Sequence, residues 1–152
     1  MDQSMPDNND QPLLSLRGVK KHFDISPPFL NRVLERKPIQ HLRAVDGIDF
    51  DIQRGTTFSL VGESGCGKST VAKLVVGLYS VSEGRISFEG TDVTDMPAGK
   101  PLELRQRMQM IFQDPYASLN PRWRVRDIIA KPLRSFGLRR SRAEESEEVG
   151  KL

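Results

Sequence analysis

The sequence predicts an α/β fold with a largely parallel β-sheet. Thr57 to Val61, TFSLV, is a short apolar run that suits a strand buried on both faces. A glycine-rich loop and the segment STVAKLVVGL follow. Four apolar residues of that segment share one face of a helix: Val71, Leu74, Val75 and Leu78. GRISFEGTDV then predicts a strand and turn, LELRQRM a short helix, and Gln109 to Phe112, QMIF, a second buried strand. Strands that alternate with helices favour this fold class.

Two further strands are predicted before the glycine-rich loop. Leu13 to Val19 is one, with Leu14, Leu16 and Gly18 on one side and Val19 on the other. The second is AVDGIDFDIQRG, in which apolar residues alternate with polar ones: Val45, Ile48, Phe50 and Ile52. Between them, residues 25–41 read as a surface insertion bounded by prolines. Part of it has a possible helical face of Leu30, Val33 and Leu34.

The character of the chain changes after Asn120, where NPRWRVRDIIAKPL predicts a helix broken by Pro132. Its apolar face is Val125, Ile128 and Ile129. Ser141 and Glu144 have capping-box spacing for another helix, which begins close to the end of the chain. We therefore expect a disordered tail over 1–12, a core over 13–122 and the start of an incomplete helical subdomain over 123–152.

Composition narrows the class of protein. A chain of 152 residues suits one domain, and 23 basic against 20 acidic residues carry no nucleic-acid signature. The single cysteine, Cys66, suits a reducing compartment such as the cytoplasm. The amino terminus does not resemble a secretory signal, and no apolar run reaches the roughly 20 residues of a membrane helix, so we expect membrane association only through a partner.

The glycine-rich loop GESGCGKST has the spacing GxxxxGK followed by Ser, which is typical of a phosphate-binding P-loop. Glycines at three of its positions let the backbone approach a polyphosphate closely, and the following helix adds its positive end. Lys68 would contact the β and γ phosphates, Ser69 would ligate Mg²⁺, and Thr70 would bond a more interior phosphate. The predicted nucleotide-binding residues of the loop are Gly62, Glu63, Ser64, Gly65, Cys66, Gly67, Lys68, Ser69 and Thr70. For Cys66 we expect a loop-filling role rather than a reactive thiol. The alternative for the whole stretch is a glycine turn with an exposed lysine.

A second motif, MIFQDPYASLNPR from Met110 to Arg122, follows the P-loop helix by a few dozen residues. Together the two motifs resemble the ATP-binding subunits of ABC transporters, and FQDPYASLNPR is similar to the dipeptide and oligopeptide importer group, whose relatives also move nickel or glutathione. The resemblance covers Leu13 to the end of the chain. It implies a RecA-like P-loop NTPase core with an antiparallel β edge and a helical subdomain.

The resemblance also implies roles for single residues. Gln113 matches the Q-loop glutamine, which approaches Mg²⁺ or the attacking water, so that Lys68 and Gln113 have catalytic roles and Ser69 and Gln113 hold the metal. A polar cap at the end of a buried strand is the alternative for Gln113. Phe23 falls where the family places an aromatic residue that stacks on adenine, and an ordinary core phenylalanine is the alternative there.

Three features of the family do not occur in this sequence: the LSGGQ-type signature, the acidic pair after a hydrophobic strand, and the switch histidine. Asp114 matches the Q-loop rather than the acidic pair, and His22 and His41 both precede the P-loop. The chain therefore resembles the amino-terminal portion of such a subunit, and we expect it to bind ATP without hydrolysing it.

The partners that the resemblance implies are a second ABC ATPase subunit, identical or not, the transmembrane permease subunits and, indirectly, a solute-binding protein. Its implied location is the cytoplasmic face of the cell membrane. The alternatives are a stand-alone nucleotide-binding or regulatory module without ATPase activity, and a non-transport ABC ATPase.

Overall fold

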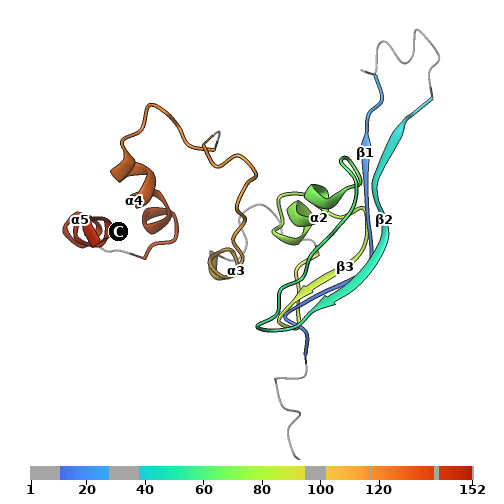
Figure 1. Cartoon of the computed structure of the whole chain (residues 1–152), viewed down its shortest axis with the longest axis horizontal. Coiled ribbons are helices and arrows are strands. Elements are labelled where there is room, and N and C mark those ends of the chain that lie inside the picture. Colours follow the sequence, from blue (N-terminus) through green and yellow to red (C-terminus); the bar gives the residue numbers. More distant parts are fainter. Residues whose placement is uncertain (1–10, 28–37, 95–101, 117, 139–140, 152) are drawn as a thin grey trace, which may run out of the picture. The chain divides into compact units, whose positions relative to one another are not determined.

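The structure is a computed structural model that describes residues 11–27, 38–94, 102–116, 118–138 and 141–151. The chain forms two compact units, unit 1 from Met1 to Lys100 and unit 2 from Pro101 to Leu152. Unit 1 holds a β-sheet with the helix α2 (Lys68–Val75), and the described part of unit 2 is helical apart from its connecting segments (Figure 1). Each unit is described by itself below.

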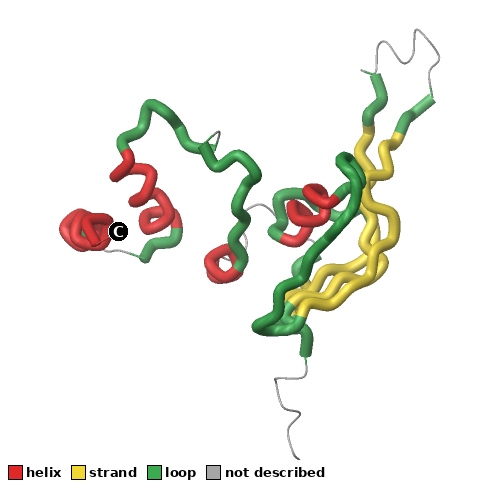
Figure 2. Tube along the Cα trace, viewed as in Figure 1, coloured by secondary structure: helices red, strands yellow, loops and turns green. Residues whose placement is uncertain are grey.

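Unit 1 is built on a four-stranded sheet (Figure 2). Its strands are β1 (Leu14–Asp24), β2 (His41–Ile52), β3 (Glu83–Phe88) and β4 (Thr91–Asp92). They lie in the order β2-β1-β3-β4, and every neighbouring pair is antiparallel. The prediction of a largely parallel sheet is therefore wrong for the described residues.

A β-bulge in β1 changes which side chains face the core. The prediction placed Val19 and Leu16 on opposite faces of the strand, yet both side chains are fully buried. The register against β2 shifts between these two residues, where Gly18 has a φ of +56° and its N–H donates to Asp49 Oδ1 over 2.8 Å. The extra residue of a bulge reverses the alternation of side chains, so Val19 turns inward.

The core of unit 1 lies between the sheet and the helix α2 (Lys68–Val75). Its buried apolar residues are Leu14, Leu16, Val19, Val45, Val71, Leu74, Ile86, Phe88 and Val93. The predicted apolar face of α2 is confirmed for Val71 and Leu74, whereas Leu78 is 55% exposed. The helix ends before Leu78 because Gly77, at φ +71°, completes a Schellman motif. In this motif the N–H of Leu78 donates to Lys73 O over 2.8 Å and that of Gly77 to Leu74 O over 3.0 Å.

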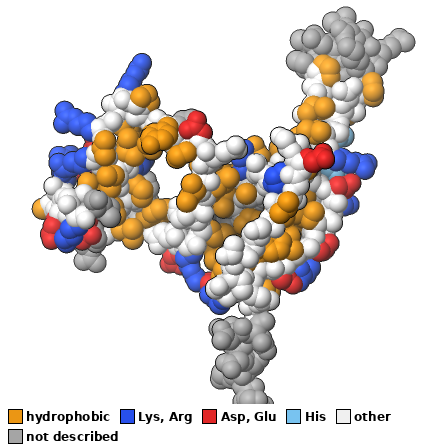
Figure 3. Space-filling view, in the orientation of Figure 1, with side chains coloured by type: hydrophobic (Ala, Val, Ile, Leu, Met, Phe, Trp, Pro, Cys, Tyr) orange, Lys and Arg blue, Asp and Glu red, His pale blue; other side chains and the backbone are white. Residues whose placement is uncertain are grey.

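Neither predicted buried strand forms within the described residues. Thr57 to Val61 and Gln109 to Phe112 are extended segments without a strand partner, and Val61 and Ile111 are each 90% exposed. Hydrophobic side chains are visible on the face of unit 1 that Figure 3 shows. A strand that is apolar on both faces is stable only between hydrogen-bonded neighbours and covering helices, and the described residues supply no parallel neighbour.

Unit 2 contains α3 (Leu102–Arg107), α4 (Val125–Ser135) and α5 (Arg142–Lys151). The prediction that Pro132 breaks the second of these helices is wrong, because α4 continues to Ser135. Pro132 is exposed, and the helix ends instead at a Schellman motif around Gly137, at φ +63°. Val125 was predicted on the apolar face, but it is 72% exposed.

The start of α5 follows the predicted capping pattern. The N–H of Glu144 donates to Ser141 Oγ over 3.2 Å, as an N-cap serine requires. One helical turn after Ser141, Glu145 is buried and accepts two hydrogen bonds from Arg134, at 2.7 and 2.6 Å. These bonds lower the pKa of the Glu145 carboxyl and join α4 to α5.

Hydrogen bonds close the base of the predicted insertion over 25–41. The Ile25 N–H donates to Gln40 O over 3.0 Å, and the Gln40 N–H donates to Ser26 Oγ over 2.9 Å. Residues 28–37, with the predicted helical face, lie outside the described residues, as do the first ten residues of the predicted tail. Among the helices that the structure describes, none is long and apolar enough to cross a membrane.

Candidate nucleotide-binding site

The glycine-rich loop leaves little room for a side chain at two of its positions, against the Cys66 side chain at one and against backbone at the other. A Cβ atom on Gly62 would lie 2.7 Å from Cys66 Sγ, and one on Gly67 would lie 2.3 Å from the carbonyl oxygen of Ala44 on β2. Gly65 and Gly67 have φ values of +83° and +98°, a region that favours glycine. The spacing of glycines in the sequence is therefore matched by close backbone approach and left-handed geometry.

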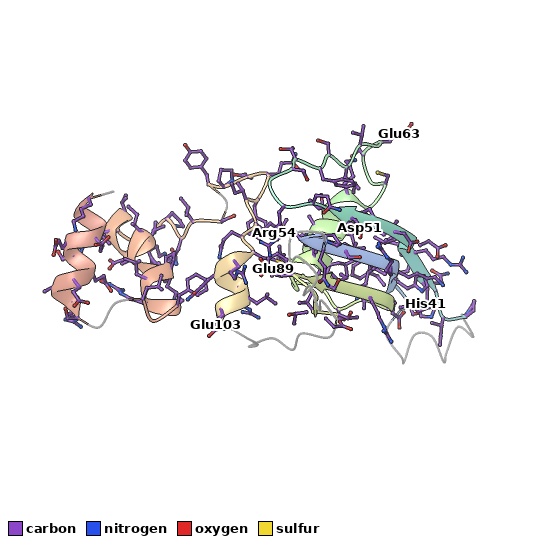
Figure 4. All side chains as sticks on the ribbon, turned by 90° about the horizontal axis from the view of Figure 1, so that it is seen from below. His41, Asp51, Arg54, Glu63, Glu89 and Glu103 are labelled. Atoms are coloured by element: carbon purple, nitrogen blue, oxygen red, sulfur yellow. The ribbon has the colours of Figure 1, made fainter. Side chains whose placement is uncertain are left out.

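Lys68 begins α2 and folds back over the loop. Its Nζ donates to the carbonyl oxygens of Gly62, over 2.8 Å, and Glu63, over 2.6 Å, and lies 3.5 Å from Cys66 Sγ. Among the described residues it forms no ion pair, so its charge is compensated by the two carbonyl dipoles and the nearby Cys66 sulfur. Figure 4 shows Glu63 on the loop, away from Asp51 on β2 and from Arg54 in the turn after that strand. A cation held in this way is available to an anionic ligand.

The amino-terminal end of α2 presents unopposed backbone donors. Its N-cap is Gly67, no side chain caps it, and its first turn has no acidic residue. The free N–H groups and the helix dipole both favour an anion at this end. The loop, Lys68 and α2 together fit a phosphate chain.

The loop offers fewer ligands to Mg²⁺ than it offers donors to phosphate. Ser69 is exposed at the start of α2, and its hydroxyl is a hard oxygen ligand of the kind that Mg²⁺ takes. Thr70, next along the helix, is half-buried. The described residues contain no cluster of three or more His, Cys, Asp or Glu that could hold a metal ion. These residues therefore fit a metal held mainly by phosphate oxygens, with Ser69 as the ligand from the loop.

Phe23 lies on β1 and is half-buried. Its ring meets that of Tyr79 edge to face, with centroids 5.3 Å apart and planes at 79°. Lys21 Nζ lies 5.1 Å from the centroid of the Phe23 ring, and Lys73 Nζ lies 5.4 Å from that of Tyr79. Sequence reasoning found Phe23 and missed the other three residues, because their contact depends on how the turn after α2 meets β1. The stacking role of Phe23 stays a prediction.

Gln113 belongs to unit 2, where it is exposed at a bend. The turn after it is held by two bonds from Ser118, whose Oγ donates to Asp114 O over 3.2 Å and whose N–H donates to Pro115 O over 3.2 Å. Gln113 and Ser69, the two predicted Mg²⁺ ligands, belong to different units. That they hold one metal ion together stays a prediction.

A cavity of about 600 Å³ lies between β2 and the loop. Phe58, Leu60 and Val61 line it beside Cys66 and Lys68. Phe58 also stacks on Phe50, with centroids 4.7 Å apart. This largely apolar wall suits packing against further protein rather than a phosphate chain, so the phosphate site is the loop and the end of α2.

Comparison with known proteins agrees with this geometry. The sequence pattern of the ABC transporter family matches residues 45–151, which include the loop, α2 and Gln113. The chain belongs to the ABC transporter family. The region of the ABC pattern begins in β2 and continues into α5.

Two relatives within the ABC family are oligopeptide transport ATP-binding proteins. AppF of Bacillus subtilis is 41% identical over 144 residues, and OppF of Salmonella typhimurium is 42% identical over 137 residues. The alignments cover 93% and 90% of this chain, but 42% and 40% of the relatives. The chain therefore spans about two fifths of the length of the curated relatives it matches.

A solved ABC structure shares the fold. The ATP-binding cassette MJ0796, in its dimeric post-hydrolysis state bound to ADP and phosphate, matches with a TM-score of 0.70 at 20% identity. The match covers 91% of this chain and 54% of that one. It confirms the predicted cassette fold, an α/β core with an antiparallel β edge.

Proposed function

We propose that the chain binds Mg-ATP through Gly62 to Thr70 as part of the ATP-binding subunit of an ABC importer. The observation that carries this proposal is the uncapped start of α2, where the loop and Lys68 present donors to one anion. The importer moves peptides or similar small solutes, as the names of the two relatives suggest.

In this proposal the loop residues position phosphates and compensate their charge. Lys68 exchanges its hydrogen bonds to the Gly62 and Glu63 carbonyls for bonds to β and γ phosphate oxygens. Ser69 and Gln113 hold Mg²⁺, and Phe23 stacks on the base. Catalysis of phosphoryl transfer depends on positioning and on electrostatic stabilisation of the transition state. Hydrolysis also needs a residue that polarises the attacking water. Residues 13–122 form the nucleotide-binding core in this scheme, and 123–152 begin the helical subdomain.

The proposed partners follow from the same family. A second ABC ATPase subunit faces the nucleotide, the permease subunits dock on this one, and a solute-binding protein acts through them. The subunit then lies at the cytoplasmic face of the cell membrane as a peripheral protein.

The test is equilibrium binding of Mg-ATP to the wild-type chain and to Lys68→Ala. We expect weak binding that falls by roughly tenfold or more in the variant, because a charge-assisted contact to phosphate is lost. Arg85→Ala, which removes a cation from β3, is the matched control and should bind as the wild type does. Equal binding by all three chains would refute the proposal.

Turnover of ATP is a separate measurement on the same chains. We expect no hydrolysis above background, because the chain contains neither the signature motif nor the acidic pair. Hydrolysis that disappears in Lys68→Ala would show that the described residues suffice for chemistry.

A further inference from the structure

We propose that Tyr79 is a positioning residue for the Phe23 ring, and that it thereby contributes to recognition of the adenine base. This inference rests on the proposed function. Its starting point is the edge-to-face contact between the two rings, with centroids 5.3 Å apart and planes at 79°. Aromatic pairs favour this arrangement, in which the positive edge of one ring meets the negative face of the other.

Tyr79 is fixed to the helix that carries the phosphate site. Its N–H donates to Lys73 O over 3.2 Å, next to the Schellman bond from Leu78 to the same oxygen. Lys73 belongs to α2, the helix that begins at Lys68. The position of the Tyr79 ring is therefore set from the same element that positions the phosphate donors.

The segment after Tyr79 is also joined to the three residues of β1 that precede Phe23. Lys21 Nζ donates to Ser80 O over 2.7 Å, and the His22 N–H donates to Ser82 Oγ over 2.9 Å. Lys20 Nζ donates to Glu83 Oε2 over 2.7 Å. These bonds hold β1 and the turn in one register, which keeps the two rings within contact of each other.

Two cations complete the cluster. Lys21 Nζ lies 5.1 Å from the centroid of Phe23, and Lys73 Nζ lies 5.4 Å from that of Tyr79. Attraction between an ammonium group and a ring face restrains both rings further. A ring that is already oriented loses less conformational entropy when a base stacks on it. Tyr79 should therefore strengthen binding of the base and leave binding of the phosphates unchanged.

The test compares Mg-ATP with Mg-tripolyphosphate, which has the phosphates and no base, on the full 152-residue chain. In Tyr79→Leu we expect the dissociation constant for ATP to rise about three- to tenfold, with that for tripolyphosphate unchanged. Tyr79→Phe keeps the ring and should restore the wild-type ratio of the two constants. In a Phe23→Leu background, Tyr79→Leu should have no further effect on ATP.

Each other outcome overturns the inference in a recognisable way. Equal weakening of both ligands in Tyr79→Leu assigns Tyr79 a structural role only, and wild-type dissociation constants for both ligands remove its role altogether. Normal ATP binding by Phe23→Leu rejects the stacking ring while leaving the phosphate site in place. Failure of the wild type to bind either ligand rejects the proposed function itself. If Tyr79→Leu does not fold, Tyr79→Met replaces it with the same expectations, since it fills similar space without a ring.

Discussion

Unit 1 contains two β-type regions that differ in what surrounds them. In the sheet, β1 lies between β2 and β3, and Leu16 is fully buried. The segment from Thr57 to Val61 is richer in apolar residues than β1, but it has no strand partner among the described residues, and Val61 is 90% exposed. Apolar composition therefore identifies a candidate strand, whereas hydrogen-bonded neighbours decide whether the strand forms.

Amide hydrogen exchange should show the largest contrast between the two regions. We expect the amide of Leu16, which is fully buried on the strand between β2 and β3, to exchange only when the sheet opens, slowed by roughly 10³-fold or more. The amides of Ser59 and Leu60 should exchange almost as fast as in a short peptide. Strong protection of Ser59 and Leu60 would mean that the segment is paired in solution, for instance with a second copy of the chain.

Truncation of one leucine in each region should give the next largest contrast. Leu16→Ala leaves a cavity in the core, and we expect it to lower the free energy of unfolding by about 2–5 kcal/mol. Leu60 is 40% exposed, so Leu60→Ala should change the same quantity by about 0.5 kcal/mol or less. Urea unfolding of both variants measures this, and similar losses would show that the segment contributes to the core.

The same contrast explains how much could be predicted from the sequence. The loop, the start of α2 and the N-cap Ser141 depend on neighbouring residues, and their patterns identified them correctly. The inward turn of Val19 could not be predicted, because it depends on the bulge at Gly18 and on its partner Asp49, 31 positions away. The contact of Tyr79 with Phe23 likewise depends on the pairing of distant segments.

A glycine on β3 should be more sensitive to substitution than a glycine outside the sheet. Gly84 on β3 has a φ of +90°, and a Cβ atom there would lie 2.3 Å from Gly18 O on the neighbouring strand. We expect Gly84→Ala to cost about 2–4 kcal/mol, through backbone strain and displacement of β1. Gly55 also has a positive φ, +70°, but no atom lies within 4 Å of its Cβ position, so Gly55→Ala should cost about 1 kcal/mol. Equal losses in urea unfolding would mean that strand contact adds nothing to the backbone strain.

The smallest effect should come from a charge pair on the exposed side of the sheet. Arg17 on β1 donates to Asp51 on β2 over 2.7 Å. This hydrogen bond, with a second one from Ser15, lowers the pKa of the Asp51 carboxyl. Because the folded pKa is below the unfolded one, near 3.9, the pair stabilises the sheet fully above that value. Its contribution is lost as the pH falls through the lowered folded pKa.

Asp51→Asn should therefore lower stability slightly at neutral pH and reduce the further loss of stability between pH 5 and pH 2. The effect should shrink in high salt, because both side chains are partly exposed. Glu63→Gln removes one carboxylate from the loop instead. Among the described residues Glu63 has no ion pair, so this variant should keep the acid dependence of the wild type. The measurement is urea unfolding at several pH values, and an acid limb unchanged in Asp51→Asn would show that the cross-strand pair contributes nothing to the stability of the sheet.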